Sequence, residues 1–372
     1  MTRPDRPSRI DQVLHILAAH DAIGAHVIHN REALRALGVQ SDIFAGDAHP
    51  EVRHLAKSLD DLPITGGRDH WLWFHHSTGS AVAEAVLRRP EPIVIDYHNV
   101  TPADYVRRWA PWVREELELG AEQLRMLAPA SFFGVAHSRF SEHELHEAGC
   151  AHTRVVAPLF DLDGPPAPDP VALAALDARR SGGGADWVFV GRISPHKAQH
   201  DLVKALACYR QCYDPSARLH LVGTALGIDY RRALERFAVR LGLRDAVHFA
   251  GVVSDAVLAA YYRSADVFVC VSDHEGFCVP LVEAMHRGLP VIAYGTAAVG
   301  ETVGDGGLVL ADKEPMTVAA AVHRVIQDRA LRRTLVEAGR GRARQFSLAR
   351  GRAGIAEALA AATAAHAEEA VR

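Results

Sequence analysis

The stretch "VHFAGVVSDAVLAAYYRSADVFVCVS", residues 247–272, decides the fold class. It begins with a short apolar run that ends in Gly (247–251), continues with a pattern typical of a helix (254–265), and ends with a second apolar run (266–272). Short apolar runs separated by a helix are typical of parallel strands in a sheet that helices cover on both faces. The stretch therefore predicts an α/β fold built on a parallel sheet.

The same alternation extends in both directions from this stretch. In the second half, we predict further strands at 187–191, 218–223 and 290–295, and helices at 198–212, 229–242 and 280–287. In the first half, we predict strands at 12–17, 41–46, 70–76, 91–98 and 131–138, and helices near 24–37, 79–88, 104–126 and 140–148. We therefore expect two Rossmann-like, doubly wound domains that face a cleft, with ligands outside the carboxyl ends of the strands.

The length of 372 residues agrees with two domains, because single hydrophobic cores stop growing near about 250–300 residues. The segment "DLDGPPAPDP" (161–170) is polar and rich in Pro, which is typical of a linker. We place the first domain at 1–165, the linker at 166–186 and the second domain at 187–345. A C-terminal helix is predicted at 346–372, and its packing back toward the first domain is left open.

The charge balance excludes some classes of partner. The chain has 41 basic and 45 acidic residues, so its net charge of −4 gives no electrostatic case for binding nucleic acid. The surplus of acidic residues lies in the first half, and no apolar run is long enough to span a bilayer, so we expect at most weak peripheral membrane contact. The start, "MTRPDRPSRI" (1–10), does not have the pattern of a signal peptide.

The cysteines favour a reducing compartment. There are five of them, an odd number without the spacing of a disulfide framework or of a zinc site. They are Cys150, Cys208, Cys212, Cys270 and Cys278. We expect buried, reduced thiols and a cytoplasmic protein.

The motif "VGRISPHK" (190–197) carries two cations just beyond a predicted strand. Arg192 and Lys197 could grip a diphosphate, the Arg as a planar fork and the Lys as a point charge. The alternative, two solvated loop cations, explains this motif equally well when it is taken alone.

The motif "SDHEGFCVPLVEAM" (272–285) follows another strand and contains a helix start. Pro280 suits the first turn of a helix, and Gly276 permits close approach of a ligand to the backbone. The helix start would attract an anion, with Glu275 in front of it. Glu283 lies about one turn inside the helix, where it could accept hydrogen bonds from a hydroxyl pair such as a ribose. The alternative, two surface carboxylates, loses weight because the paired cations lie upstream.

Four stretches together carry a family resemblance. They are "VGRISPHKAQHDLVKA", "LHLVG", the stretch quoted first, and "HEGFCVPLVEAMHRGLPVIAYG". In this order they closely resemble the nucleotide-sugar glycosyltransferases of the GT-B fold, family 4, the retaining "glycosyl transferases group 1". The resemblance is strong from residue 187 to about 345. No G-x-G-x-x-G motif is present, which argues against a dinucleotide-dependent dehydrogenase.

The resemblance implies roles for residues of the second half. Arg192 and Lys197 would hold the donor diphosphate and stabilise its developing charge. Glu275 would contact the sugar, while the N–H groups of Gly276 and Phe277 would contact phosphate. The other donor-binding residues that it implies are Gly24, Gly191, Val253 near the base, Cys278, Val279, and Glu283 at the ribose. Cys278 departs from the pattern, since the family often has Gly there.

The first half resembles the family's acceptor-binding domain more loosely. In "HDAIGAH" (20–26), only Gly24 remains of the usual glycine pair beside the donor phosphates. In "YHNVTP" (97–102), His98 would contact and orient the transferred sugar. The acceptor contacts that we predict are His75, His76, Ser77 and Asn99. For each histidine, a hydrogen-bonded structural role is the alternative.

The resemblance implies a hexosyltransferase that uses a UDP- or GDP-linked sugar, retains the anomeric configuration, and needs neither a metal nor a cofactor. The acceptor could be a small molecule, a lipid-linked molecule or a polysaccharide. The leaving phosphate would take the acceptor proton. No D-x-D pair follows a strand, since "DLD" (161–163) lies in the linker. Two alternatives stay open: a sugar-nucleotide epimerase or phosphorylase of the same fold, and a nucleotide-sugar-binding protein without turnover.

Overall fold

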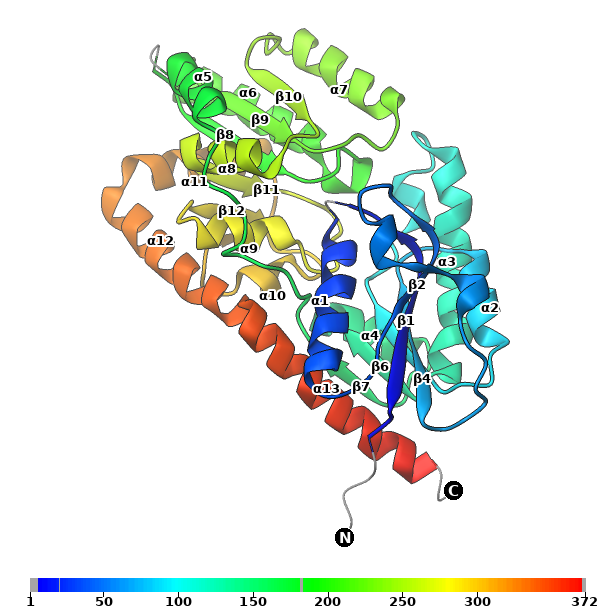
Figure 1. Cartoon of the computed structure of the whole chain (residues 1–372). Coiled ribbons are helices and arrows are strands. Elements are labelled where there is room, and N and C mark those ends of the chain that lie inside the picture. The colour runs from blue at the N-terminus through cyan, green and yellow to red at the C-terminus, as the bar shows by residue number, and fades with distance from the viewer. Residues whose placement is uncertain (1–5, 20, 181–182, 370–372) are drawn as a thin grey trace. The chain divides into compact units, whose positions relative to one another are not determined.

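The computed structural model describes residues 6–19, 21–180 and 183–369. The beginning of the N-terminal stretch, His20 of the "HDAIGAH" motif, residues 181–182 of the predicted linker and the last three residues of the chain lie outside the described residues. The chain divides into two compact units (Figure 1). Unit 1 comprises Met1–Ala103, Trp112–Phe160 and Phe346–Arg372, and unit 2 comprises Asp104–Pro111 and Asp161–Gln345.

Unit 1 contains a seven-stranded parallel sheet in the order β3-β2-β1-β4-β5-β6-β7. Its strands are β1 (Arg9–Leu17), β2 (Ile43–Ala48), β3 (Lys57–Ser58), β4 (His70–His76), β5 (Ile93–Tyr97), β6 (Phe133–Ala136) and β7 (Thr153–Val155). Its helices are α1 (Ala22–Ala36), α2 (Ala81–Leu87), α3 (Pro111–Ala130), α4 (Arg139–Glu147) and α13 (Leu348–Glu369). The strand order reverses between β1 and β4, and ligands of such sheets bind beyond the carboxyl ends of the strands at this point.

Unit 2 contains a six-stranded parallel sheet in the order β10-β9-β8-β11-β12-β13. Its strands are β8 (Asp186–Val190), β9 (Arg218–Val222), β10 (Val247–Gly251), β11 (Val267–Cys270), β12 (Val291–Tyr294) and β13 (Leu308–Leu310). Its helices are α5 (Pro170–Arg180), α6 (Gln199–Cys212), α7 (Ile228–Arg240), α8 (Asp255–Ser264), α9 (Val279–His286), α10 (Val299–Val303), α11 (Pro315–Gln327) and α12 (Arg329–Ala343). Here the order reverses between β8 and β11. Two Rossmann-like units confirm the predicted α/β class of the GT-B fold.

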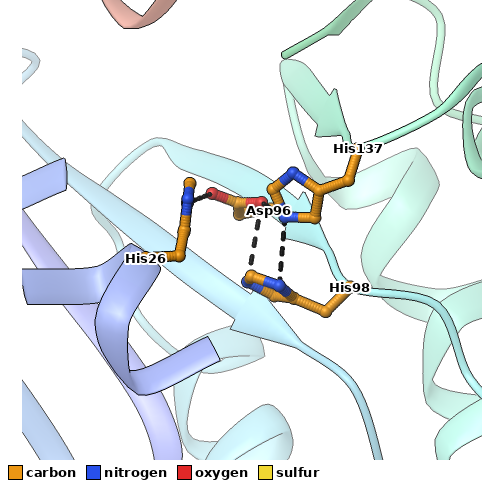
Figure 2. A group of neighbouring side chains, drawn as sticks. All are labelled: His26, Asp96, His98 and His137. Carbon is orange, nitrogen blue, oxygen red and sulfur yellow. Dashed lines mark hydrogen bonds and ion pairs between the residues drawn. The ribbon is translucent and has the colours of Figure 1, made fainter. Parts of the chain in front are cut away.

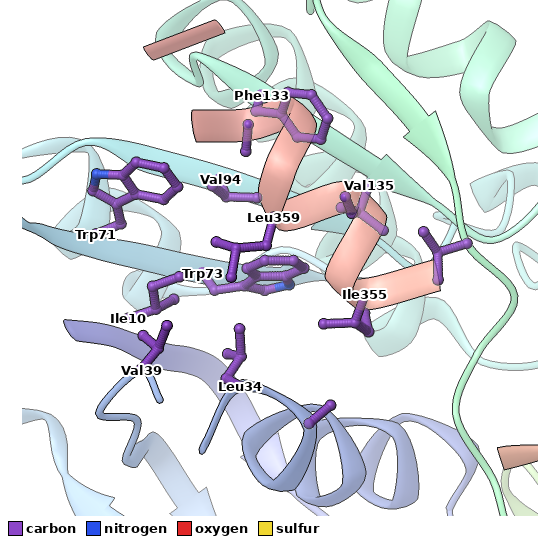
Figure 3. Packing of buried hydrophobic residues seen from close by; sticks show 14 of the residues in the cluster. Ile10, Leu34, Val39, Trp71, Trp73, Val94, Phe133, Val135, Ile355 and Leu359 are labelled. Atoms are coloured by element: carbon purple, nitrogen blue, oxygen red, sulfur yellow. The ribbon is translucent and has the colours of Figure 1, made fainter. Parts of the chain in front are cut away.

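The last long helix, α13, belongs to the core of unit 1. Trp71 and Trp73 of β4 pack in one cluster with Leu34 of α1 and with Ile355 and Leu359 of α13 (Figure 3). All five side chains are at most 1% exposed. Burying one large apolar side chain contributes about 1.5–3 kcal/mol, so α13 stabilises unit 1 although it follows unit 2 in the chain.

Local sequence explains where several elements begin and end. Ser138 and Ser254 cap α4 and α8, since each hydroxyl accepts a hydrogen bond from a backbone N–H of the first turn. Gly242 and Gly288 follow the ends of α7 and α9 with φ values of 73° and 72°. Such left-handed backbone suits Gly, which lacks a Cβ.

Two predicted boundaries differ from the structure. Segment 166–186 contains α5, whose Leu176 is buried, and the Asp169 amide donates a 2.9 Å hydrogen bond to the carbonyl of Ala256. This segment therefore folds as part of unit 2. The helix predicted at 104–126 begins only at Pro111, a residue that suits a first helical turn. Among the residues described, no helix is both long and apolar enough to cross a bilayer.

Candidate active site

Two glycines shape the carboxyl edge of β8 and β9 in unit 2. A Cβ on Gly223 would lie 2.2 Å from the carbonyl oxygen of Gly191, so the segments that follow β8 and β9 approach more closely than a side chain on Gly223 would allow. Gly191 and Gly223 also have φ values of 148° and 137°, which L-residues rarely adopt. Arg192 follows directly and is exposed. Within the part of the chain that is described, its guanidinium forms no ion pair, so it is available to a ligand.

Lys197 and Glu275 bring together the two predicted motifs. The Nζ of Lys197 lies 2.5 Å from Oε2 of Glu275, and their side chains are 19% and 6% exposed. Burial is the largest effect and lowers the pKa of Lys197, but Glu275, with smaller effects of Cys278 and Cys270, raises it by more in total, so the net shift of the pKa is upward. The ammonium group therefore stays charged. An ammonium has three N–H donors, and the carboxylate takes one, which leaves donors for an anion at this edge.

The loop that carries Glu275 is fixed by its carbonyl groups. The amide of Ala298 donates to the carbonyl of Glu275 (3.2 Å), and Oγ1 of Thr302 donates to the carbonyl of Phe277 (2.6 Å). In a trans peptide, the next N–H points away from the carbonyl. The N–H groups of Gly276 and Cys278 therefore face away from α10. A row of backbone donors in this orientation suits an anion.

Cys278 ends this loop with a φ of 75°, a left-handed conformation. Gly fits such a position without strain, which gives a physical reason for the glycine that the resemblance implies there. A hydrogen bond to Cys270 and burial raise the pKa of Cys278 well above its ordinary value. The sulfur atoms of both cysteines and a carboxylate oxygen of Glu275 lie within 4.8 Å of one another. The carboxylate of this group is already paired with the Lys197 ammonium, whose positive charge disfavours a second cation at this point.

Glu283 lies on α9, one turn beyond the loop. Its Oε2 accepts a 2.7 Å hydrogen bond from the hydroxyl of Tyr262 on α8. Burial raises the pKa of Glu283. The carboxyl group has a second oxygen for a ligand hydroxyl. Val279 opens the same helix, and Val253, half-buried, follows the carboxyl end of β10.

The structure adds an ion network that the sequence analysis missed. Nζ of Lys313 lies 2.8 Å from Oδ2 of Asp201 and 2.5 Å from Oδ1 of Asp273. Asp273 begins the loop that carries Glu275, and Asp201 lies on α6. Lys313 therefore ties the start of the loop to a helix. Its position just after β13, at the carboxyl edge of the sheet, is the signal that could have identified it.

In unit 1, polar side chains follow core side chains along one face of four strands. Side chains two residues apart on a strand share a face. On this face, core residues at the amino ends of the strands are followed by polar residues toward the carboxyl ends. The rows are Ile10 and Gln12 on β1; Trp71, Trp73 and His75 on β4; Val94, Asp96 and His98 along β5; and Phe133, Val135 and His137 along β6. The predicted His98 is therefore one member of a buried cluster with His26, Asp96 and His137 (Figure 2).

The other residues predicted in the first half have partners in unit 1. Nδ1 of His75 lies 3.0 Å from Nε2 of His98, and Nε2 of His76 lies 2.9 Å from the carbonyl oxygen of Gly120. Burial lowers the pKa of His75 to about 3 and that of His76 to about 4, so both are neutral. The Nδ2 of Asn99 donates to Glu144. The contacts of His75 and His76 therefore agree with the alternative given above, a hydrogen-bonded structural role for each histidine.

Gly24 and Ser77 complete the predicted set. A Cβ on Gly24 would lie 2.3 Å from the carbonyl oxygen of Ala18, so this glycine lets α1 approach the chain that leaves β1. Ser77 is half-buried directly after β4. Sequence reasoning missed Asp96 and His137, although a histidine follows or ends each of the three strands β4, β5 and β6. That repetition was the available signal.

Comparisons with known proteins agree with this geometry. The model of the family "Glycosyl transferases group 1" matches residues 179–342. A D-inositol 3-phosphate glycosyltransferase of Geodermatophilus obscurus is 37% identical over 229 residues, which are 58% of this chain and 48% of that protein. One of Frankia alni is 30% identical over 287 residues, 73% of this chain and 69% of that protein. The chain thus spans about half of the first relative and over two thirds of the second.

A solved structure shows the same fold. The crystal structure of Anabaena Alr3699/HepE in complex with UDP and glucose has a TM-score of 0.71 and 21% identity, and the match covers 93% of this chain and 98% of that chain. The fold, the motifs at the carboxyl edge of unit 2 and the relatives lead to one assignment. The chain belongs to the glycosyl transferases group 1 family.

Proposed function

We propose that this protein transfers a hexosyl group from a nucleoside-diphosphate sugar to an acceptor hydroxyl, with retention of configuration and without a metal ion. The observation that carries the proposal is the meeting of Lys197 with Glu275 at the point where the strand order of unit 2 reverses. Arg192 is exposed at the same edge. These three residues come from the two motifs that the sequence analysis assigned to the donor.

The donor diphosphate would bind to Arg192, Lys197 and the backbone amides of the loop. Two cations would stabilise the negative charge that develops on the leaving phosphate as the glycosidic bond breaks. Gly276 would offer its N–H to a phosphate oxygen. Glu283, whose second oxygen is available, would accept hydrogen bonds from the ribose hydroxyls. The released phosphate would take the proton of the acceptor hydroxyl on the same face.

The choice of donor and acceptor follows the relatives. The names of two relatives specify transfer to D-inositol 3-phosphate, and the HepE structure contains UDP and glucose. UDP-sugars are therefore the first donors to test, with GDP-sugars as the second group. Inositol phosphates are the first acceptors to test, because the two relatives carry D-inositol 3-phosphate in their names.

The experiment measures release of nucleoside diphosphate from a panel of UDP- and GDP-sugars, with and without acceptor. We expect acceptor-dependent release, unaffected by EDTA, and at least a hundredfold loss of kcat/KM in Lys197→Ala and in Glu275→Ala. The matched control is Arg324→Met, which removes an exposed ion pair of unit 2. Equal release by wild type and both site variants would refute the assignment of these residues, and a product with the opposite anomer would refute retention.

Tight nucleotide binding without acceptor-dependent release would instead favour a binding protein without turnover. Interconversion of the donor sugar in the absence of acceptor would favour an epimerase. These outcomes separate the alternatives that the sequence left open.

A further inference from the structure

Five titratable side chains of unit 1 are packed together at the carboxyl edge of the sheet. They are His26 of α1, His75 of β4, Asp96 of β5, and His98 and His137, which follow β5 and β6 (Figure 2 shows four of them). Their side chains are at most 4% exposed. Buried polar groups need hydrogen-bond partners, so the position of every proton in this cluster matters.

One end of the histidine chain is fixed by Gln12. Nε2 of Gln12 donates to the carbonyl of Val27 (3.0 Å), so its Oε1 faces Nε2 of His75 at 2.9 Å. That amide oxygen can only accept, which puts the His75 proton on Nε2 and leaves Nδ1 as an acceptor. The 3.0 Å bond between Nδ1 of His75 and Nε2 of His98 therefore requires a proton on Nε2 of His98.

The other end is fixed by a backbone carbonyl. Nδ1 of His137 lies 2.9 Å from the carbonyl oxygen of Val156 and must donate to it. Between the two ends, Nδ1 of His98 and Nε2 of His137 face each other at 3.0 Å along a hydrogen bond. If both rings were neutral, both nitrogens would present lone pairs, and the bond could not form. The chain of three rings thus needs one proton more than three neutral imidazoles carry.

Asp96 supplies the balancing negative charge. Its Oδ2 accepts hydrogen bonds from Nε1 of Trp73 (2.7 Å) and from Nε2 of His26 (3.0 Å). Its Oδ1 lies 3.0 Å from Nε2 of His137. The amide of Leu159 donates to Nδ1 of His26, so the single proton of that ring is on Nε2 and His26 is neutral. One carboxylate and one imidazolium make the cluster neutral overall, which suits burial.

The contact with Asp96 assigns the extra proton to His137, since Nε2 of His137 lies 3.0 Å from Oδ1 of Asp96, whereas Nε2 of His98 lies 3.7 Å from the same oxygen. Burial lowers the pKa of His98 well below its ordinary value, and it lowers the pKa of His75 to about 3. Burial raises the pKa of Asp96, but the surrounding histidines, led by His26 and His137, lower it more, and the pKa ends well below its ordinary value. Asp96 is therefore a carboxylate, and His75 and His98 do not carry the extra proton.

A metal ion fits this arrangement less well than a proton. Zinc binds histidine nitrogen at about 2.0–2.1 Å in tetrahedral geometry, so two nitrogen ligands of one ion would be roughly 3.3 Å apart, each with its lone pair directed at the ion. The nitrogens of His98 and His137 are 3.0 Å apart. A histidine that binds a metal usually donates through its other ring nitrogen, whereas Nδ1 of His26 accepts the Leu159 amide.

We propose that His137 is a buried imidazolium with Asp96 as its counter-ion, and that this pair acts as a positioning device for His98. The pair holds Nδ1 of His98 as an acceptor and puts the His98 proton on Nε2. His98 can then act toward a sugar only as a hydrogen-bond donor, through Nε2, in place of its bond to His75. The role toward the sugar rests on the proposed function, whereas the charge state of His137 does not.

The direct test is a long-range ¹H–¹⁵N NMR spectrum of the whole chain labelled at histidine, recorded at about pH 8. This is above the ordinary histidine pKa of about 6.5, so exposed histidines are neutral. We expect one ring with the pattern of an imidazolium, which disappears in His137→Gln, and His98 as the Nε2–H tautomer. A spectrum in which every histidine is neutral would overturn the proposal, and it requires no variant. One equivalent of transition metal in purified protein would overturn it as well.

Asp96→Asn is the matched variant. Its amide oxygen can replace Oδ2 and keep the donors Trp73 and His26, while its NH₂ group faces a neutral His137. We expect the imidazolium pattern to be lost and kcat/KM for the donor to fall at least tenfold. Glu147→Gln on the exposed side of α4 is the control that leaves both unchanged. An imidazolium that persists in Asp96→Asn would contradict the ion pair. Absence of transferase activity with the imidazolium present would refute only the proposed function.

Discussion

Replacing Lys197 with Met leaves the carboxylate of Glu275, which is 6% exposed, without its cation. Breaking a buried ion pair from one side costs about 3–5 kcal/mol. Because the Lys197 side chain is 19% exposed and water can reach part of the site, we expect the lower end, about 3 kcal/mol. For a unit of this size, that lowers the melting temperature by roughly 6–12 °C.

A double-mutant cycle separates the ion pair from the rest of the site. Glu275→Gln leaves an ammonium that water can partly solvate, so we expect a smaller loss, about 1–2 kcal/mol. The double variant Lys197→Met with Glu275→Gln buries no charge and should recover to within about 1 kcal/mol of wild type. All three variants should lose donor turnover, because each removes a ligand contact.

The pH dependence gives an independent check. Burial lowers the pKa of Lys197, but Glu275 together with Cys278 and Cys270 raises it by more, so the pKa is raised above 10.5. Its contribution to stability is therefore fully present below pH 10.5 and is lost as the pH rises through the folded-state pKa. The assay is thermal unfolding of the four proteins between about pH 6 and 11, with Arg324→Met as the exposed control. A melting temperature of Lys197→Met equal to that of wild type, or a double variant no more stable than Lys197→Met, would refute the reasoning.

Three further predictions use other parts of the structure. Gly223→Ala should lower the free energy of unfolding by at least about 3 kcal/mol and abolish donor use, because the new Cβ would lie 2.2 Å from the carbonyl oxygen of Gly191. The control Gly242→Ala has open space around its Cβ and a φ of 73°, so it should lower the free energy of unfolding, measured in urea, by only about 1–2 kcal/mol. Burial raises the pKa of Glu144 to about 7, so the stability of wild type should fall as the pH rises through 7. Glu144→Gln should therefore gain in melting temperature relative to wild type between about pH 5 and 8. An equal difference in melting temperature at both pH values would contradict this. Leu359→Ala should cost about 2–5 kcal/mol and increase hydrogen exchange in unit 1, whereas unchanged exchange in β4 would contradict the packing of α13.

Much of unit 2 could be predicted from the sequence, because its strands are apolar runs bounded by Gly and its helices have clear periodicity. The meeting of Lys197 and Glu275 was also predictable, since both follow strands of one parallel sheet and such ends lie along one edge. The three-residue strands β7 and β13 were missed because so short a run carries no periodic signal. Helix α13 was recognised as a helix, but only the structure shows which sheet it covers.

The repeated histidines at the ends of β4, β5 and β6 were visible in the sequence, but the contacts among them in the buried cluster of unit 1 were not. His98, His75 and His76 were singled out at two strand ends, but not as neighbours in one cluster. Asp96, a partner of His98, lies two residues earlier on β5, and the partner His137 follows the neighbouring strand β6. The proximity of His98 and His137 therefore depends on the strand order. The reason that His75 and His98 behave differently from exposed histidines is the fixed direction of their hydrogen bonds, which depends on Gln12 and on backbone groups far away in the sequence.

The most direct test of the central claim is a crystal structure of this protein with a nucleoside diphosphate. We predict that the diphosphate lies at the carboxyl edge of β8 and β11, with phosphate oxygens about 3 Å from Nζ of Lys197 and from the guanidinium of Arg192, and with the ribose at Glu283. A nucleotide bound elsewhere, or bound with Lys197 and Arg192 out of hydrogen-bond range, would contradict the account.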